Sequence, residues 1–271
     1  MSSEPLAHEL SGHNWSVKKL RAWVATKLGK AVSRSTLRTL LQQAGLSWKK
    51  CKKLLTKANP EKRTQFVEQF QVLYERMVQG EVRIIYIDEV HVHQDLDVGY
   101  TWAPKGKPAW RQSISPSLSQ RINWYGAYDF SAARTFIWHE GKCNGENTVH
   151  FLHHLATWLH ESAPKGLAQV VIIWDGASYH RSKLDRAAAE KLGFALIALP
   201  GYSPDLNPIE ALWKWLREEV THNHCHQTLH QLFLDCKAFI DSINQDPAQI
   251  LKRLWPKFDL DPEFEKLLVS N

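Results

Sequence analysis

The sequence is poor in cysteine and has no long apolar run. Among its 271 residues are four cysteines, and none has a partner at the C-x-x-C spacing of zinc and redox motifs: Cys51, Cys143, Cys225 and Cys236. This scatter is typical of a reducing compartment and predicts neither a disulfide framework nor a structural zinc. No apolar stretch approaches the roughly 18 residues that a membrane-spanning helix needs, and the N-terminus lacks a signal-peptide pattern. We therefore expect a cytoplasmic protein.

Acidic side chains are missing from one part of the chain, since none occurs between Leu10 and Pro60. Residues 1–60 contain 12 lysines and arginines against two acids, Glu4 and Glu9, which gives a charge of +10. The remaining residues contain 22 basic and 26 acidic side chains, which gives −4 and brings the whole chain to +6. Such an asymmetry predicts a nucleic-acid-binding module joined to a nearly neutral body.

The basic segment has the pattern of two short helices joined by a tight turn, which is typical of a helix-turn-helix. Ser16 can cap the first helix, and Gly29 ends it. Ser33 or Ser35 can cap the second helix, which Gly45 closes. We expect a leader over residues 1–14 and a DNA-binding module of winged-helix or helix-turn-helix type over residues 15–58.

The second helix of this module would present basic side chains to a DNA major groove. Arg34 and Arg38 lie on its outer side, opposite Leu37, Leu40 and Leu41, which we expect to face inward. The lysines that follow Trp48 could form a basic wing on the DNA backbone: Lys49, Lys50, Lys52 and Lys53. The alternative is a small helical hairpin with a solvated, charged face.

Two apolar runs rich in β-branched residues predict buried strands that end on acidic residues. A connecting helix over residues 59–80 precedes the first run, Val82–Ile87, which ends on Asp88. The second run, Val170–Trp174, ends on Asp175.

A third acid follows Asp175 after 34 intervening residues, beyond another apolar run at Phe194–Leu199. Asn207 has the position of a helix N-cap, and Pro208 has that of the first helical residue. Glu210 would therefore lie in the first turn of this helix.

The three acids would meet at one edge of the sheet and repel one another. That repulsion would raise their pKa values in a metal-free site, and divalent cations would relieve it. Oxygen-only ligands suit Mg²⁺ or Mn²⁺, and two such ions can clamp the attacking and leaving oxygens of a phosphodiester displacement. The sequence therefore predicts Asp88, Asp175 and Glu210 as metal ligands and catalytic residues. Possible accessory residues nearby are His180, Lys214 and Arg217.

The other predicted elements complete a mixed α/β sheet that helices cover. Tyr100–Trp102 predicts a second strand, and the Pro104–Pro108 turn predicts a basic loop whose Lys105 and Lys107 contact substrate DNA or are only solvated. Further predicted elements are a hairpin of Arg121–Phe130 with Arg134–His139 and helices over 147–161, 182–192 and 229–243. We expect these elements to form a catalytic domain over residues 81–245, followed by a C-terminal tail over residues 246–271.

Three stretches resemble a known family: IIYIDEVH, IIWDGASYH and LPGYSPDLNPIEALWKWL. In order and spacing of their acids they are similar to the DDE transposases of the Tc/mariner superfamily, and to its bacterial insertion-sequence 630 family. The resemblance covers residues 15 to 225. Two departures are visible: Gly176 stands where the family commonly has Asn, and relatives usually carry another helix-turn-helix module before the one found here.

The resemblance implies a ribonuclease-H-like fold and metal-dependent cutting and joining of DNA. It implies that Asp88, Asp175 and Glu210 hold two Mg²⁺ or Mn²⁺ ions. The partners would be double-stranded DNA, as terminal inverted repeats and as target with insertion at TA, and further copies of the chain in a dimer or larger assembly. The protein would associate with the nucleoid.

Ordinary structural interpretations exist for each acid. Glu210 could only cap its helix or pair with Lys214, Asp175 could only form a turn, and Asp88 could only be a solvated strand end. The occurrence of all three in order, with their flanking sequence, favours the functional interpretation. Two other functions stay open: a nuclease of the same fold that cuts without joining, and a catalytically silent DNA-binding remnant.

Overall fold

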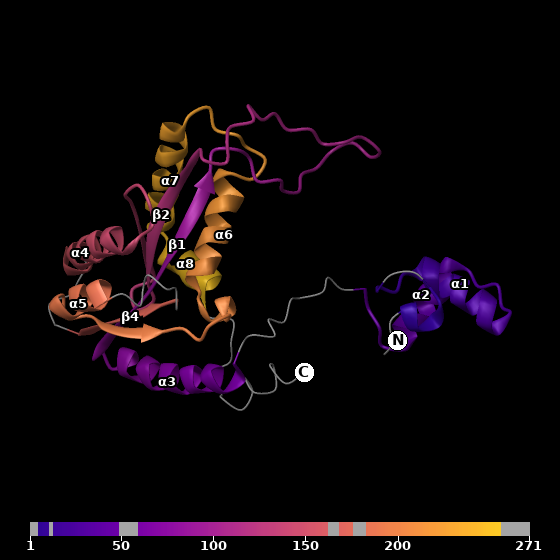
Figure 1. Ribbon diagram of the computed structural model, residues 1–271, viewed down its shortest axis with the longest axis horizontal. Helices are drawn as coiled ribbons and strands as arrows, with labels where there is room; N and C mark the ends of the chain where they lie inside the picture. The colour runs from indigo at the N-terminus through magenta and orange to yellow at the C-terminus, as the bar shows by residue number, and fades with distance from the viewer. Residues whose placement is uncertain (1–4, 11–12, 49–58, 162–167, 176–182, 256–271) are drawn as a thin grey trace. The chain divides into compact units, whose positions relative to one another are not determined.

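The computed structural model describes residues 5–10, 13–48, 59–161, 168–175 and 183–255 (Figure 1). The chain divides into two compact units, Met1–Leu54 and Leu55–Asn271. Within the described ranges, no helix is long and apolar enough to cross a membrane.

The first unit contains the two predicted helices, α1 (Val17–Leu28) and α2 (Arg34–Gln43), after a short 3₁₀ turn, η1 (Pro5–His8). The hydroxyl of Ser16 accepts the amide of Lys19 at 3.2 Å and caps α1, and Gly29 ends it with φ 62°. These features confirm the predicted helix boundaries.

The start of α2 and its apolar face refine the sequence prediction. Ser33, not Ser35, caps the helix and accepts the amide of Thr36 at 3.0 Å. Leu37 is buried, but Leu40 is 51% exposed, so the prediction that Leu40 faces inward is wrong. In the described elements of this unit the buried residues are Pro5, Val24 and Leu37, so α2 contributes one buried side chain.

The second unit is built on a five-stranded sheet with the order β3-β2-β1-β4-β5. Its strands are β1 (Val82–His93), β2 (Arg121–Asp129), β3 (Arg134–His139), β4 (Gln169–Trp174) and β5 (Ala195–Ala198). The first three strands pair antiparallel, and β4 and β5 join them in parallel. This arrangement confirms the predicted mixed sheet.

Helices cover both faces of the sheet, because alternate strand residues point to opposite sides. One face, with Ile84 and Tyr86, packs in a cluster with α3 (Pro60–Val78), α6 (Ile209–Val220), α7 (Leu229–Ile243) and α8 (Pro247–Leu254). The other face, with Ile85 and Ile87, packs against α4 (Gly145–Glu161) and α5 (Lys183–Lys191). Helix α8 lies in the stretch that the sequence analysis assigned to the C-terminal tail, and it buries Ile250 and Leu254 in the first cluster.

Strand β1 is longer than predicted. The sequence placed its end at Asp88, but pairing with β2 continues to His93 opposite Arg121. Asp88 therefore lies inside the strand, opposite Gly126, and the predicted strand end is wrong. Strand β1 continues because β2 pairs with it as far as His93, whereas its pairing with β4 ends at Tyr86.

The predicted strand at Tyr100–Trp102 is also wrong. Residues 94–120 form a long connection with one isolated bridge, Asp97 to His222, and a turn in which Lys107 donates to the carbonyl of Pro104 at 3.0 Å. Figure 1 shows this connection as a magenta loop that extends away from the sheet. Tyr100 and Trp102 are fully exposed, and none of the strands that the structure describes pairs with them.

Candidate active site

The parallel pairing of β1 with β4 brings two of the predicted acids to the same level. The last residue pair of this ladder is Tyr86 with Ile173. Asp88 lies two residues after Tyr86, and Asp175 lies two residues after Ile173. A step of two keeps a side chain on the same face of a strand. Asp88 therefore belongs to the face that α6 covers, and Asp175, the first residue after β4, interacts electrostatically with Glu210 of α6. Both acids are half-buried.

Helix α6 brings the third acid to this face (Figure 1). Trp213 of α6 donates its indole N–H to Oδ2 of Asp88 at 3.0 Å. Glu210 lies three residues earlier and Arg217 four residues later, so the three side chains share one side of the helix. The guanidinium of Arg217 donates to the carbonyl of His91 at 3.0 Å, which holds the same side of α6 against β1.

Electrostatic interactions show that the three acids lie close enough to affect one another. Burial raises the pKa of Asp88 well above its usual value, and the charges of Glu210 and Glu89 add to the rise. Desolvation of its carboxyl group also raises the pKa of Glu210, although the residue as a whole is exposed. Arg217 opposes this rise and Asp175 adds to it. Each acid therefore interacts with at least one other member of the predicted set.

The donor chemistry of this cluster fits a hard divalent cation. Within the described ranges, no group of three or more His, Cys, Asp or Glu side chains has the arrangement of a preformed metal site. The three acids nevertheless supply only oxygen donors, and their mutual repulsion is of the kind that a cation relieves. Asp88, Asp175 and Glu210 are thus the side chains that would hold Mg²⁺ or Mn²⁺.

The start of α6 differs from the sequence prediction. Asn207 closes a 3₁₀ turn, η3 (Pro204–Leu206), and Pro208, not Asn207, has the N-cap position of α6. The backbone carbonyl of Asn207 accepts the amide of Glu210 at 3.2 Å, so the turn leads directly into the helix. The side-chain oxygen of Asn207 is buried and has no hydrogen-bond partner among the described residues.

Two residues of the site were missed by sequence reasoning. Trp213 was assigned only to the apolar stripe of α6, and Gly126 was not singled out. A Cβ atom on Gly126 would lie 2.5 Å from Cζ2 of Trp213 and nearer still to Cη2, so the indole ring requires glycine at this position. The available signal was a glycine inside an apolar strand, which often marks a close approach of another group.

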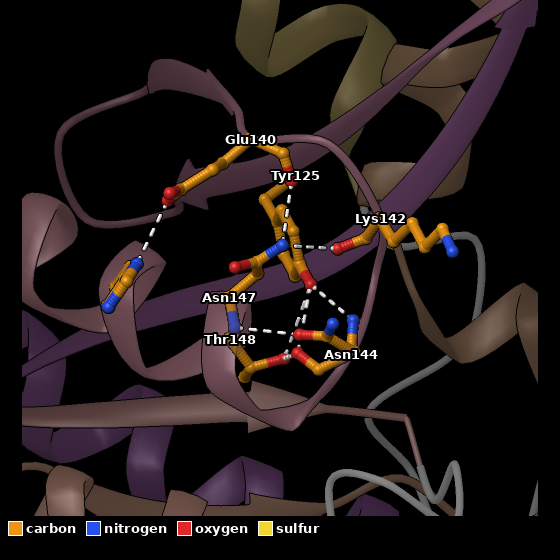
Figure 2. A network of polar contacts seen from close by, with 7 residues as sticks. Tyr125, Glu140, Lys142, Asn144, Asn147 and Thr148 are labelled. Atoms are coloured by element: carbon orange, nitrogen blue, oxygen red, sulfur yellow. Dashed lines mark hydrogen bonds and ion pairs between the residues drawn. The ribbon is translucent and has the colours of Figure 1, made fainter.

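The opposite face of the sheet carries a separate polar network (Figure 2). The hydroxyl of Tyr125 accepts the amide of Asn144 at 3.0 Å and donates to its carbonyl at 3.2 Å. Asn147 donates to the carbonyls of Glu140 and Lys142, which fixes the loop between β3 and α4. Burial, followed by the charge of Glu89, raises the pKa of Cys143 in this loop to about 11. Its thiol is therefore protonated near neutral pH, which argues against a nucleophilic role.

The loop after α6 holds the base of the long 94–120 connection. Thr221 donates its hydroxyl to Asp97 at 2.5 Å, and the backbone amide of His226 donates to the carbonyl of Gln94 at 3.0 Å. The buried His226 lies 3.2 Å from Asp235 through Nε2. The histidine-rich stretch Thr221–His226 thus holds the base of the connection next to the helix that carries Glu210.

The predicted DNA-binding side chains are exposed wherever the structure describes them. Arg34 and Arg38 project from α2 and line a cavity of about 670 Å³ with Leu41 and Trp48. Lys105 and Lys107 are exposed at the turn of the long connection. Lys214 forms an ion pair with Glu218 at 3.6 Å. The remaining predicted residues lie outside the described ranges: Lys49, Lys50, Lys52, Lys53 and His180.

Comparisons with known proteins agree with this geometry. A family model described as DDE superfamily endonuclease matches residues 83–233, and one described as winged helix-turn helix matches residues 11–70. A curated relative, the insertion element IS630 uncharacterized 39 kDa protein of Shigella sonnei, is 23% identical over 236 residues. That match covers 86% of this chain and 66% of the relative, so the chain spans just under two thirds of the relative's length.

Solved structures of a mariner transposase have a similar fold. The mariner Mos1 paired end complex with Mg superposes with a TM-score of 0.68 at 16% identity, and the complex with Mn superposes with 0.67 at 18%. The Mos1 strand transfer complex gives 0.63 at 16% identity. Each match covers 96% of this chain and 80% of the Mos1 chain. These similarities confirm the predicted ribonuclease-H-like fold and the predicted winged helix-turn-helix module.

Proposed function

Because the chain belongs to the DDE superfamily endonucleases and is similar to an insertion element IS630 protein and to the mariner Mos1 transposase, we propose that it is a DNA transposase that cuts DNA at element ends and joins the freed 3′ ends to target DNA. The observation that carries this proposal is the proximity of three acids. Asp88 and Asp175 each lie two residues beyond the last β1–β4 pair, Tyr86 with Ile173, and Glu210 interacts electrostatically with both.

In the proposed site, Asp88, Asp175 and Glu210 hold two divalent cations, Mg²⁺ or Mn²⁺. When bound, such cations supply activation of the attacking oxygen and stabilisation of the leaving oxygen. Trp213 orients the Asp88 carboxylate through its N–H. Burial raises the pKa of Glu210, and the charge of Arg217 opposes this rise and so favours the ionised form that binds a cation.

Two displacements at phosphorus make up the proposed reaction. In the first, water attacks a phosphodiester at the element end, the bond from phosphorus to the 3′ oxygen breaks, and that oxygen leaves as a 3′-hydroxyl. In the second, this hydroxyl attacks a phosphodiester of the target, loses its proton to solvent and displaces the target's own 3′ oxygen. The second step exchanges one phosphodiester for another, so it needs no nucleotide cofactor.

We also propose that the two parts of the chain have different roles. The module of residues 15–58 binds terminal inverted repeats, with Arg34 and Arg38 at the DNA. The catalytic domain of residues 81–245 performs the chemistry, and Lys105 and Lys107 of the exposed connection contact DNA phosphates. Because an element has two ends to bring together, the working form would be a dimer or a larger assembly.

The test uses a pre-cut duplex that carries the element's own terminal repeat, a plasmid target and Mg²⁺. Wild-type protein should give joined products, and Asp175→Asn should bind the duplex equally well but give none. Asp241→Asn, which changes an exposed acid of α7, is the matched control and should behave as wild type.

Each other outcome contradicts a stated part of the proposal. Cutting by Asp175→Asn would refute the metal assignment. Hydrolysis products alone would indicate a nuclease that does not join, which the description of the matched family as endonuclease also allows. Binding without any products from wild type would indicate a protein that only occupies DNA.

A further inference from the structure

One edge of the Trp213 indole contacts both members of a directly paired couple in the sheet. The ring donates from Nε1 to Asp88, and its Cζ2 and Cη2 atoms lie over Gly126. Asp88 and Gly126 are opposite each other in the β1–β2 ladder. Nε1, Cζ2 and Cη2 follow one another around a single edge of the indole, so this edge lies along the Asp88–Gly126 pair.

This arrangement leaves the ring little freedom. Trp213 is 3% exposed and packs in the apolar cluster between α6 and the sheet. If the ring rotated away from Asp88, its Cζ2 and Cη2 atoms would also have to move relative to Gly126, which they approach closely. The direction of the indole N–H is therefore set by packing and not only by its hydrogen bond.

The carboxylate of Asp88 needs a neutral donor of this kind. A basic residue in contact with it would compete with a cation for the same oxygens. An indole N–H donates a charge-assisted hydrogen bond without adding a positive charge. Among the described residues, the hydrogen bonds to Asp88 come from the indole of Trp213 and from the backbone of Glu89, whereas a carboxylate can accept about four.

We propose that Trp213 is a positioning residue, which fixes the Asp88 carboxylate for divalent-cation binding, and that Gly126 is required because only glycine leaves room for the indole edge. This inference rests on the proposed function, since it presupposes that Asp88 is a metal ligand. It assigns to Trp213 a role beyond the apolar stripe of α6 and to Gly126 a role beyond strand pairing.

Trp215 provides a matched control for the loss of an indole. It lies on the same helix and is equally buried at 3%. Its ring packs edge-on against Phe239 at 5.3 Å and beneath the guanidinium of Arg253 at 4.5 Å. A Trp215→Phe change therefore perturbs α6 by a similar amount without touching Asp88.

The test measures Mn²⁺ binding to the full chain by titration calorimetry without DNA, next to cleavage of the terminal-repeat duplex. Trp213→Phe and Gly126→Ala should each weaken Mn²⁺ binding by about tenfold or more, which is the usual effect of removing a group that orients a ligand. Trp215→Phe should bind as wild type. Cleavage by Trp213→Phe should be recovered at high Mn²⁺ concentration, because Asp88 itself is still present, while DNA affinity stays unchanged.

The outcomes separate this inference from the proposed function. If wild type binds Mn²⁺ and cuts DNA, and Trp213→Phe does the same at the same metal concentration, the positioning role is refuted and the proposed function stands. If Trp215→Phe weakens binding as much as Trp213→Phe, the effect belongs to helix packing and the role is again refuted. If wild type neither binds Mn²⁺ nor cuts, both fail together. Thermal unfolding of each variant identifies any that do not fold, and Gly126→Ala, which retains all the tryptophans, supplies a second and independent measurement.

Discussion

Replacing Gly126 with alanine should destabilise the protein through one defined clash. The new Cβ would lie 2.5 Å from Cζ2 of Trp213, whereas carbon atoms in good contact are about 3.5–4.0 Å apart. The ring, or the strand beneath it, must therefore move by roughly 1 Å or more. Neither can do so easily, because Trp213 is buried and Gly126 lies between two neighbouring strands.

Overpacking of this kind costs about 1–3 kcal/mol of unfolding free energy. For a unit of this size each kcal/mol corresponds to a shift of about 2–4 °C in Tm, so the expected fall is roughly 2–12 °C. Gly201→Ala is the control, because a Cβ at Gly201 meets no atom within 4 Å and its φ is not in the left-handed region. This control should stay within about 0.5 kcal/mol of wild type.

A double-mutant cycle tests whether Trp213 is the cause. Phenylalanine at position 213 lacks the outer ring atoms that meet the new methyl group, so Gly126→Ala should cost less in the Trp213→Phe background than in wild type. We expect a coupling free energy of about 0.5–3 kcal/mol from urea unfolding of the four proteins. Additive effects, or a Gly126→Ala protein as stable as wild type, would refute the reasoning.

Two further predictions concern pH and salt. Burial and the neighbouring His224 lower the pKa of His226 in the folded chain, although Asp235 opposes them. The stability contributed by this site is therefore present above the ordinary histidine pKa of about 6.5 and is lost as the pH falls below it. His226→Gln should reduce that loss in urea unfolding at pH 7.5 and 5.5, and equal losses in both proteins would contradict the assignment. Arg38→Ala should weaken DNA binding. If Arg38 contacts a phosphate, the slope of log affinity against log salt concentration should fall in magnitude by about 0.9. An unchanged slope together with a loss of sequence preference would indicate a base contact instead.

Local patterns were sufficient to predict most of the fold. The β-branched runs at Val82 and Val170 became central paired strands, and the serine and glycine signals bounded α1 as predicted. These predictions succeeded because capping and burial act over a few residues. The helix α7 (Leu229–Ile243) was predicted with its observed limits for the same reason.

Predictions failed where distant segments decide the outcome. The alternation of valine and histidine over residues 90–93 has the pattern of a strand, so the continuation of β1 was visible in the sequence. We nevertheless took the acidic pair Asp88-Glu89 as the end of the strand. Tyr100 and Trp102 have strand-like side chains, yet no partner strand lies beside them. β-Propensity alone does not create a strand without a neighbour to pair with.

The candidate site divides in the same way. Each acid follows a local signal, a buried run or a helix start, so the set could be found from the sequence. The contact between Trp213 and Asp88 joins residues 125 positions apart and depends on the register of β1 with β2 and on the rotational position of α6. No local pattern specifies either quantity. The sequence signal of such a contact is a glycine inside a buried strand. This signal can be interpreted here only because the register of β1 with β2 places Gly126 opposite Asp88.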